Sequence, residues 1–521
     1  MAERAQPVGA FHWVGVGAIG LVLCLTLLPL GAVAFRAEGA SGLRASDWAV
    51  IRFTVVQAAV SAVLSVALAI PLARALARRQ FWGRQALIML LGAPFILPVI
   101  IAVLGILALF GRAGLVNTMA EFFGLPPIDI FGIQGVILAH VFLNLPLATR
   151  LLLGGWERIP TERFRLATSL GFTQAALERH FHWPILREVV PGALLAIFLI
   201  CTTSFAVALI LGGGPRATTV ELAIYQAFRF DFDLARAAWL GLIQVAICAA
   251  TGLFVLRFAL PRELGSGLGR KNSHWPGLGR RSLGIDVLAL VLATSFLALP
   301  ILMVGLRGLP AFPDLPVSVW HAALRSIIIA VVSAVLATSL ALAIATASLK
   351  SDRAVLSQTI SFLGVAVSPL VIGTGLFILL RPLASPNALA LPLTALVNAI
   401  VALPFVLRAL GPSLKSVHAA RGPLAENLRL SGLTLWRHVY LPGIARPLGF
   451  GAGLAAAFSM GDLGVIALFS ISDTATLPLE MFRLMGSYRT ADAEAAALLL
   501  LILALGIFAI CDQIGRRYAS A

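Results

Sequence analysis

Long apolar segments alternate with short polar ones along the whole chain. Twelve of these segments have about 20 residues or more, which is the length that a helix needs to cross the hydrocarbon core of a bilayer. The predicted spans are residues 13–35, 51–74, 86–110, 132–156, 191–213, 235–259, 284–306, 322–347, 357–380, 388–410, 447–470 and 493–514. The alternation expected of barrel strands is missing, and backbone groups inside a bilayer must bind one another. The pattern therefore predicts an all-α polytopic membrane protein with about twelve transmembrane helices.

The first apolar segment requires a choice between a signal peptide and a retained helix. Arg4 precedes it, and the residues "GAVA" at 31–34 resemble a cleavage site. Its apolar core is longer than the roughly 7–15 residues that are typical of a signal peptide. We therefore expect it to remain as the first transmembrane helix.

Charge is distributed unevenly between the predicted loops. The chain is 60% hydrophobic and 12% charged, and its formal net charge is +16. Basic residues gather in the loops that the spans place on one side, and acids such as Glu221, Asp231, Asp233 and Asp473 lie on the other. The positive-inside rule makes the basic side cytoplasmic, with both termini on it. The net charge thus indicates orientation in a bacterial inner membrane rather than binding to nucleic acid.

Motifs for catalysis and metal binding are missing from the sequence. The four cysteines lie inside apolar segments without the spacing of a metal site. Neither H-E-x-x-H nor the phosphate loop G-x-x-x-x-G-K-[ST] occurs. An intramembrane enzyme would need a convergent nucleophile, base or metal set, and none is found. We expect no metal site, no cofactor and no enzymatic activity in this chain.

The chain is a tandem repeat with one constant offset. Three pairs of segments are separated by 258 residues: "LPLATR" and "LPFVLR" ending at Arg150 and Arg408, "LATSLGFTQAALERHFHWP" and "LAENLRLSGLTLWRHVYLP" ending at Pro184 and Pro442, and "SFAVALIL" and "DLGVIALF" ending at Leu211 and Phe469. We predict a first half at 1–260, a cytoplasmic linker at 261–282 and a second half at 283–521. Six spans in each half make the halves parallel, with a pathway between them near the midplane.

The most polar part of the repeat is the long loop after the fourth span of each half, at 157–188 and 412–446. In the first copy Gly171 permits a tight bend, and Pro184 starts or breaks the next helix. The residues between them, "FTQAALERHFH", favour a short amphipathic helix on the membrane surface. Two copies on the cytoplasmic side indicate docking of another protein rather than simple connectors.

This loop resembles the EAA loop of ATP-binding-cassette (ABC) importer permeases, whose coupling helix docks in a groove of the ATPase. The family's Glu-Ala-Ala corresponds to Arg165-Leu166-Ala167 and to Pro423-Leu424-Ala425. The position of the family glycine is Gly171 in the first copy and Arg429 in the second. The resemblance therefore does not predict the conformation of the second bend, although Gly432 lies close by. The resemblance implies the type I importer fold and these coupling residues: Arg165, Leu166, Ala167, Gly171, Pro184, Leu424, Ala425, Arg429, Gly432 and Pro442.

Two fused halves resemble a narrower group, the iron(III) and thiamine importer permeases. The segments at 218–238 and 475–489 are most similar to the thiamine members. The resemblance implies transport of thiamine or its phosphates, a periplasmic binding protein and two copies of a separate ATPase that holds ATP and magnesium. The same machinery importing iron(III) or another small solute remains an alternative. A gradient-driven secondary carrier also fits twelve spans in two halves, but leaves the duplicated loop unexplained.

Polar residues inside the spans are candidates for the substrate pathway. Asp462 lies within the eleventh span, where an ionisable side chain is costly and usually faces a cavity. Its repeat partner is Ser204, next to Thr202 and Thr203, and the fourth span adds His140 and Asn144 opposite Asn398 and Ala402. Each of these could instead hold helices together through hydrogen bonds.

Overall fold

The computed structural model describes residues 9–37, 44–92, 96–214, 217–258, 280–349, 367–430, 432–470 and 474–520, and its regular elements there are all helical. The first half contains α1 (Gly9–Ala37), α2 (Ala45–Arg78), α3 (Arg84–Leu90), α4 (Val99–Phe110), α5 (Leu115–Phe122), α6 (Ile133–Glu157), α7 (Thr161–Ser169), α8 (Gln174–Leu177), the π-helix η2 (Glu178–His182), α9 (Trp183–Thr202), α10 (Ala206–Leu211), α11 (Val220–Arg229) and α12 (Leu234–Phe258). The second half contains α13 (Arg280–Ala311), α14 (Val317–Ala347), α16 (Pro369–Leu380), α17 (Pro386–Asn427), α18 (Gly432–Leu435), the π-helix η5 (Trp436–Tyr440), α19 (Leu441–Met460), α20 (Gly464–Phe469), α21 (Leu477–Gly486) and α22 (Thr490–Ser520).

Eleven helical segments of the described residues are long and apolar enough to cross a membrane, which confirms an all-α polytopic architecture. The predicted ninth span falls partly outside the described residues, which include only the 12-residue α16 from it. Most of the predicted linker also lies outside them, since residues 259–279 are not described.

Three predicted spans are not continuous helices, and a fourth is longer than predicted. The span at 86–110 divides into α3 and α4, and Pro98 caps α4 in an extended conformation because proline cannot continue a preceding helix. The spans at 191–213 and 447–470 break into α9 and α10, and into α19 and α20. The span at 388–410 extends as α17 to Asn427, into the predicted loop. In the first half Pro160 separates the corresponding α6 and α7, whereas the second half has His418 at that position.

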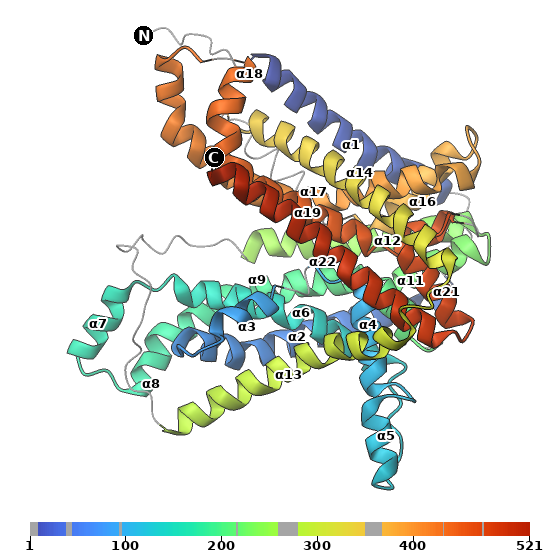
Figure 1. Cartoon of the computed structure of the whole chain (residues 1–521), viewed down its shortest axis with the longest axis horizontal. Helices are drawn as coiled ribbons and strands as arrows, with labels where there is room; N and C mark the ends of the chain where they lie inside the picture. The colour runs from blue at the N-terminus through green and yellow to red at the C-terminus, as the bar shows by residue number, and fades with distance from the viewer. Residues whose placement is uncertain are drawn as a thin grey trace.

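The first helix of each half packs on the opposite half. Helix α1 lies against α14 and α16, and α13 lies against α2 and α4 (Figure 1). Both crossings depend on a glycine. Gly375 of α16 meets the backbone of Pro29 in α1, and Gly105 of α4 meets the backbone of Pro300 in α13, so closely that neither position has room for a Cβ atom. The two halves are therefore interlocked rather than merely side by side.

The two ends of the bundle carry different elements. Helices α7, α8 and α18 gather at one end, together with the last turn of α22, and α11 and α21 gather at the other end (Figure 1). We call these the docking end, after the role predicted for its loops, and the outer end, after its predicted side of the membrane. The segments at the outer end are not open loops, because α11 is almost entirely buried and α21 largely so. This packing places parts of both segments in the interior of the protein.

Candidate functional site

The breaks in α9/α10 and α19/α20 fall at equivalent positions of the repeat. Residues 203–205 interrupt the first helix and residues 461–463 the second, again 258 positions apart. At the first break the Thr203 hydroxyl donates to the carbonyl of Ile200 at 3.2 Å. At the second break Asp462 accepts from the amide of Val465 at 3.4 Å. Discontinuous helices of this kind form substrate sites in many transporters because they present polar groups at membrane depth.

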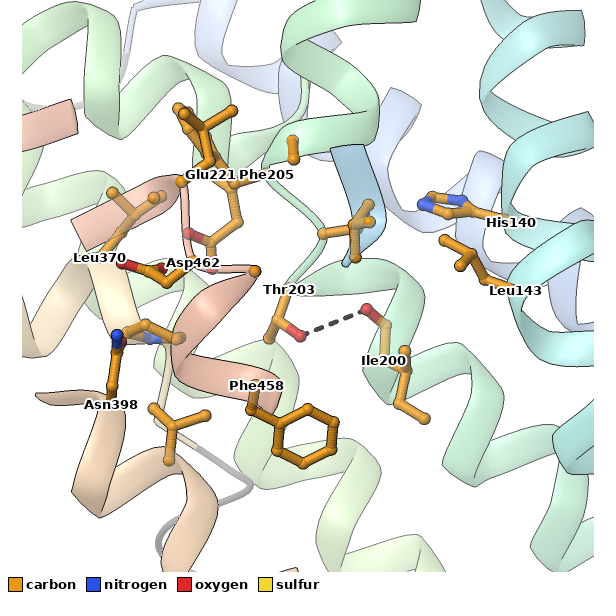
Figure 2. Close-up of a pocket in the computed structure, with 18 of the residues that line it drawn as sticks. His140, Leu143, Ile200, Thr203, Phe205, Glu221, Leu370, Asn398, Phe458 and Asp462 are labelled. Atoms are coloured by element: carbon orange, nitrogen blue, oxygen red, sulfur yellow. Dashed lines mark hydrogen bonds between the residues drawn. The ribbon is translucent and has the colours of Figure 1, made fainter. Parts of the chain in front are cut away.

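A cavity of about 360 Å³ lies between the two halves at these breaks (Figure 2). Its volume falls within the range of small-molecule sites, roughly 300–1,000 Å³. Its walls follow the repeat, because eight pairs of lining residues are each separated by 258 positions: His140 and Asn398, Leu143 and Val401, Leu147 and Phe405, Ile200 and Phe458, Thr203 and Gly461, Ser204 and Asp462, Phe205 and Leu463, Ala206 and Gly464. The cavity therefore lies on the pseudo-two-fold axis that relates the halves.

Five of the six residues that the sequence placed in the pathway line this cavity, namely Asp462, Ser204, Thr203, His140 and Asn144. The sixth, Thr202, does not, because it is fully buried and its hydroxyl donates to the carbonyl of Leu199 at 2.7 Å. The structure thus brings together residues that are far apart in the sequence.

Hydrogen bonds hold the polar wall residues to neighbouring helices in both halves. Asn144 donates to the carbonyl of His140 one turn earlier in α6 at 2.8 Å, and the His140 ring lies 3.4 Å from the Ser61 hydroxyl of the neighbouring α2. In the second half Asn398 donates to Ser459 at 3.1 Å, and Ser459 donates to Ser333 at 3.0 Å. These bonds connect α2 to α6 and α14 to α17 and α19. His140 and Asn398 therefore both line the cavity and bond to a neighbouring helix.

Glu221 is the cavity residue that sequence reasoning missed. The sequence placed it among the acids of an outer loop, whereas it lies in the first turn of the buried helix α11 and lines the cavity. The signal was present: Val220–Phe228 carries apolar residues on nearly every side, and such a segment cannot remain an open loop. The single acid in its first turn was therefore a candidate for burial.

The repeated loops form the same bend twice. In the first copy the amides of Leu170, Gly171 and Phe172 donate to the carbonyls of Leu166, Thr168 and Ala167. In the second copy the amides of Leu428, Arg429 and Leu430 donate to the carbonyls of Leu424, Glu426 and Ala425. Every position is shifted by 258 residues, and the pattern is the Schellman motif that ends helices.

The second bend does not need the missing glycine. Gly171 has φ = 64° and Arg429 has φ = 52°, so arginine adopts the left-handed conformation that glycine adopts in the first copy. Gly432 also has a positive φ of 58°, three residues later. The left-handed region is disfavoured for residues with a Cβ atom, so the second bend carries local strain.

Replacing Arg429 with glycine is expected to stabilise the protein by about 0.5–1 kcal/mol, because glycine has no Cβ penalty at this φ. The matched change Gly171→Ala should destabilise it by about 1 kcal/mol for the opposite reason. Thermal unfolding of the purified protein in detergent measures both. Equal shifts of the two variants in the same direction would contradict this account of the bends.

The amphipathic helix expected after each bend is not a separate element. Helix α8 continues through the π-helix η2 directly into α9, and α18 continues through η5 into α19. Pro184 and Pro442 are the second residues of α9 and α19, directly after the π-helical turns, and each lacks the amide hydrogen that would bond to the preceding turn. Each loop is therefore continuous with a helix that reaches the cavity.

Both loops expose leucines at equivalent positions. Leu166 and Leu424 are 59% and 61% exposed, and Leu170 and Leu428 are both 62% exposed, while Ala167 and Ala425 are buried beneath them. Arg165 beside them is exposed. We call these four residues, Leu166, Leu170, Leu424 and Leu428, the docking leucines. Paired apolar patches in an otherwise polar segment are typical of surfaces that bind another protein.

The two loops are held to the bundle by different interactions. In the first copy Glu178 of η2 pairs with Arg74 and Arg78 of α2. In the second copy the hydroxyl of Tyr440 in η5 lies 2.8 Å from the His418 ring, and the Trp436 ring packs against Tyr440. The architecture of the loops is thus repeated although their anchors differ.

Comparison with known proteins gives relatives over nearly the whole chain, although no family model matches it. The thiamine transport system permease protein ThiP of Brucella abortus (strain 2308) is 38% identical over 474 residues, which cover 89% of this chain and 87% of that protein. The protein of the same name from Escherichia coli (strain K12) is 37% identical over 540 residues, covering 99% of each. A probable sulfate transport system permease protein, cysT of Helicosporidium sp. subsp. Simulium jonesii, is 23% identical over 46% of this chain and 90% of its own length.

The last of these relatives corresponds in size to one half of this chain, as the tandem repeat requires. The first two extend through both halves at an identity well above 30%. The chain belongs to the family of thiamine transport system permease proteins.

Proposed function

We propose that this chain is the permease subunit of an ABC importer and forms the transmembrane pathway for thiamine or its phosphates. The observation that carries this proposal is the cavity on the pseudo-two-fold axis, lined by two broken helices at repeat-related positions. Family membership supports thiamine over iron(III) as the substrate. A gradient-driven carrier would not account for two matched bends that each present exposed leucines.

Two copies of a separate cytoplasmic ATPase are the proposed partners at the docking end. One copy would bind Leu166 and Leu170, and the other Leu424 and Leu428. ATP and magnesium would be held by the ATPase, so that this chain needs no cofactor of its own. Closure of the ATPase dimer would bring the two loops together, and α9 and α19 would carry that movement to the breaks beside the cavity. This is alternating access by motion of one half against the other.

A periplasmic binding protein is the proposed partner at the outer end. Phe232 and Tyr488 lie there at equivalent places, just before α12 and α22, and are 80% and 92% exposed. Both have left-handed backbones, with φ of 53° and 61°. Exposed aromatic side chains held in a strained conformation are typical of recognition surfaces. The docking end and both termini would then face the cytoplasm of a bacterium, in keeping with the basic loops.

The test of this proposal is reconstitution of the chain with the ATPase and binding protein in lipid nanodiscs. We expect ATP hydrolysis to rise when the binding protein carries thiamine, and to rise little when it is empty. Stimulation by an iron-loaded binding protein instead would retain the importer mechanism and discard thiamine. Failure of any ATPase to co-purify with the chain would contradict the importer mechanism itself.

A further inference from the structure

The cavity holds two carboxyl groups that pair with no cationic side chain among the described residues. Glu221 is fully buried; Ser368 is its polar neighbour, yet neither carboxylate oxygen has a hydrogen bond of normal geometry to any described residue. Asp462 uses one oxygen to cap α20 through Val465; Asn398 is its polar neighbour, yet its other oxygen is buried without a hydrogen bond of normal geometry to any described residue. Ionised carboxylates are costly to bury without a partner, and a positively charged ligand between these two groups would compensate that cost.

No protein side chain supplies that positive group within the cavity. Every lining residue is described, and none of them is lysine or arginine. His140 lines the cavity on α6, away from the two carboxylates (Figure 2). Figure 2 shows Glu221 and Asp462 extending into the same space, Glu221 from α11 and Asp462 from the break after α19. The cavity therefore has two carboxyl groups on one side and no permanent positive charge among its lining residues.

The remaining walls suit a flat apolar group. Phe205, Phe405 and Phe458 line the cavity, and the rings of Phe405 and Phe458 lie 5.0 Å apart in an edge-to-face arrangement. Aromatic faces attract cations and stack on flat rings. A small organic cation with an aromatic ring would satisfy both the carboxylates and these side chains, whereas a hydrated metal ion would leave the aromatic walls unused.

We propose that Glu221 and Asp462 together form the recognition site for a ring-bearing organic cation, with Glu221 as the specificity-determining residue contributed by the first half only. This proposal rests on the proposed function, because thiamine carries a positively charged thiazolium ring. Neither acid has an acidic counterpart in the other half, so the cavity is asymmetric. The repeat partner of Asp462 is Ser204. Glu221 is the second residue of α11, and the second residue of the corresponding helix α21 is Pro478. The asymmetry gives the bound cation a single preferred orientation.

The experiment compares Glu221→Gln with Glu480→Gln in proteoliposomes that contain the complete importer. Glu480 is a matched control because it lies on α21, the counterpart of α11, and pairs with Arg483 outside the cavity. We expect Glu221→Gln to lower thiamine uptake at least about tenfold, as loss of one partner of a buried charge pair does. Stimulation of ATP hydrolysis by the loaded binding protein should persist, and Glu480→Gln should transport normally. Uptake by Glu221→Gln equal to that of the parent would overturn the proposal.

A second measurement does not depend on thiamine or on transport. Thr203 lines the cavity, so a Thr203→Cys variant of a protein with its four native cysteines replaced by alanine reports the charge there. We expect a cationic methanethiosulfonate reagent to react faster than an anionic one, and Glu221→Gln to reduce the ratio of the two rates at least about fivefold. An unchanged ratio would refute the charged site. If the parent importer does not carry thiamine but the ratio falls, the proposed substrate fails while the cation site stands.

Discussion

Replacing Leu166 and Leu424 together by aspartate should release the ATPase from the complex and abolish uptake. Both side chains are about 60% exposed on the docking end. Complete burial of a leucine side chain is favourable by about 1.5–3 kcal/mol. A partner that covers them gains this energy twice. An aspartate in the same contact loses it and adds the cost of burying a charge. Each substitution should therefore weaken the ATPase contact at least about tenfold, and the pair about a hundredfold.

Co-purification of the ATPase with the tagged chain, followed by ATP hydrolysis, measures this loss. Met119→Asp is the matched control, since Met119 is 55% exposed on α5, which does not belong to the docking end (Figure 1). Each single variant should retain one contact and lose part of the activity. Normal ATPase recovery with the double variant would mean that the docking leucines are not the contact surface.

The repeat offset is the feature of the sequence that relates distant residues of the cavity to one another. It pairs Ser204 with Asp462 and His140 with Asn398, and all four line one cavity. The reason is physical: equivalent positions of two parallel halves meet on the axis between them. Thr202 was adjacent in sequence but faces away, because neighbouring residues of a helix point in different directions.

Hydropathy alone concealed the features that shape the cavity. The breaks at 203–205 and 461–463 lie inside segments that remain apolar throughout, so a window of average hydrophobicity passes over them. Glu221 is hidden for the opposite reason, because the sequence predicts an exposed loop between spans where the structure has the short buried helix α11. The packing of α1 on the second half and of α13 on the first half is also not predicted, since an apolar helix face does not reveal which neighbour it contacts.

The crossed helices give the second large expected effect, which concerns folding rather than transport. Gly375→Leu should destabilise the protein by at least about 2 kcal/mol, because the new side chain would collide with the backbone of Pro29 and force α1 away from α16. Gly105→Leu should do the same at the crossing of α4 and α13, where the obstacle is the backbone of Pro300. Thermal unfolding and size-exclusion profiles in detergent measure both effects.

Gly20→Leu and Gly305→Leu are the controls within the crossing helices themselves. Neither position has an atom within 4 Å of an added Cβ, and leucine is favoured over glycine inside a helix by roughly 1 kcal/mol. These two variants should therefore be neutral or slightly stabilising. The sign of the stability change then distinguishes a close helix crossing from a general destabilisation by large side chains. If Gly375→Leu and Gly20→Leu behaved alike, α1 would not be clamped on the second half. In the proposed mechanism the interlock would let the two halves rock about the cavity without separating from each other.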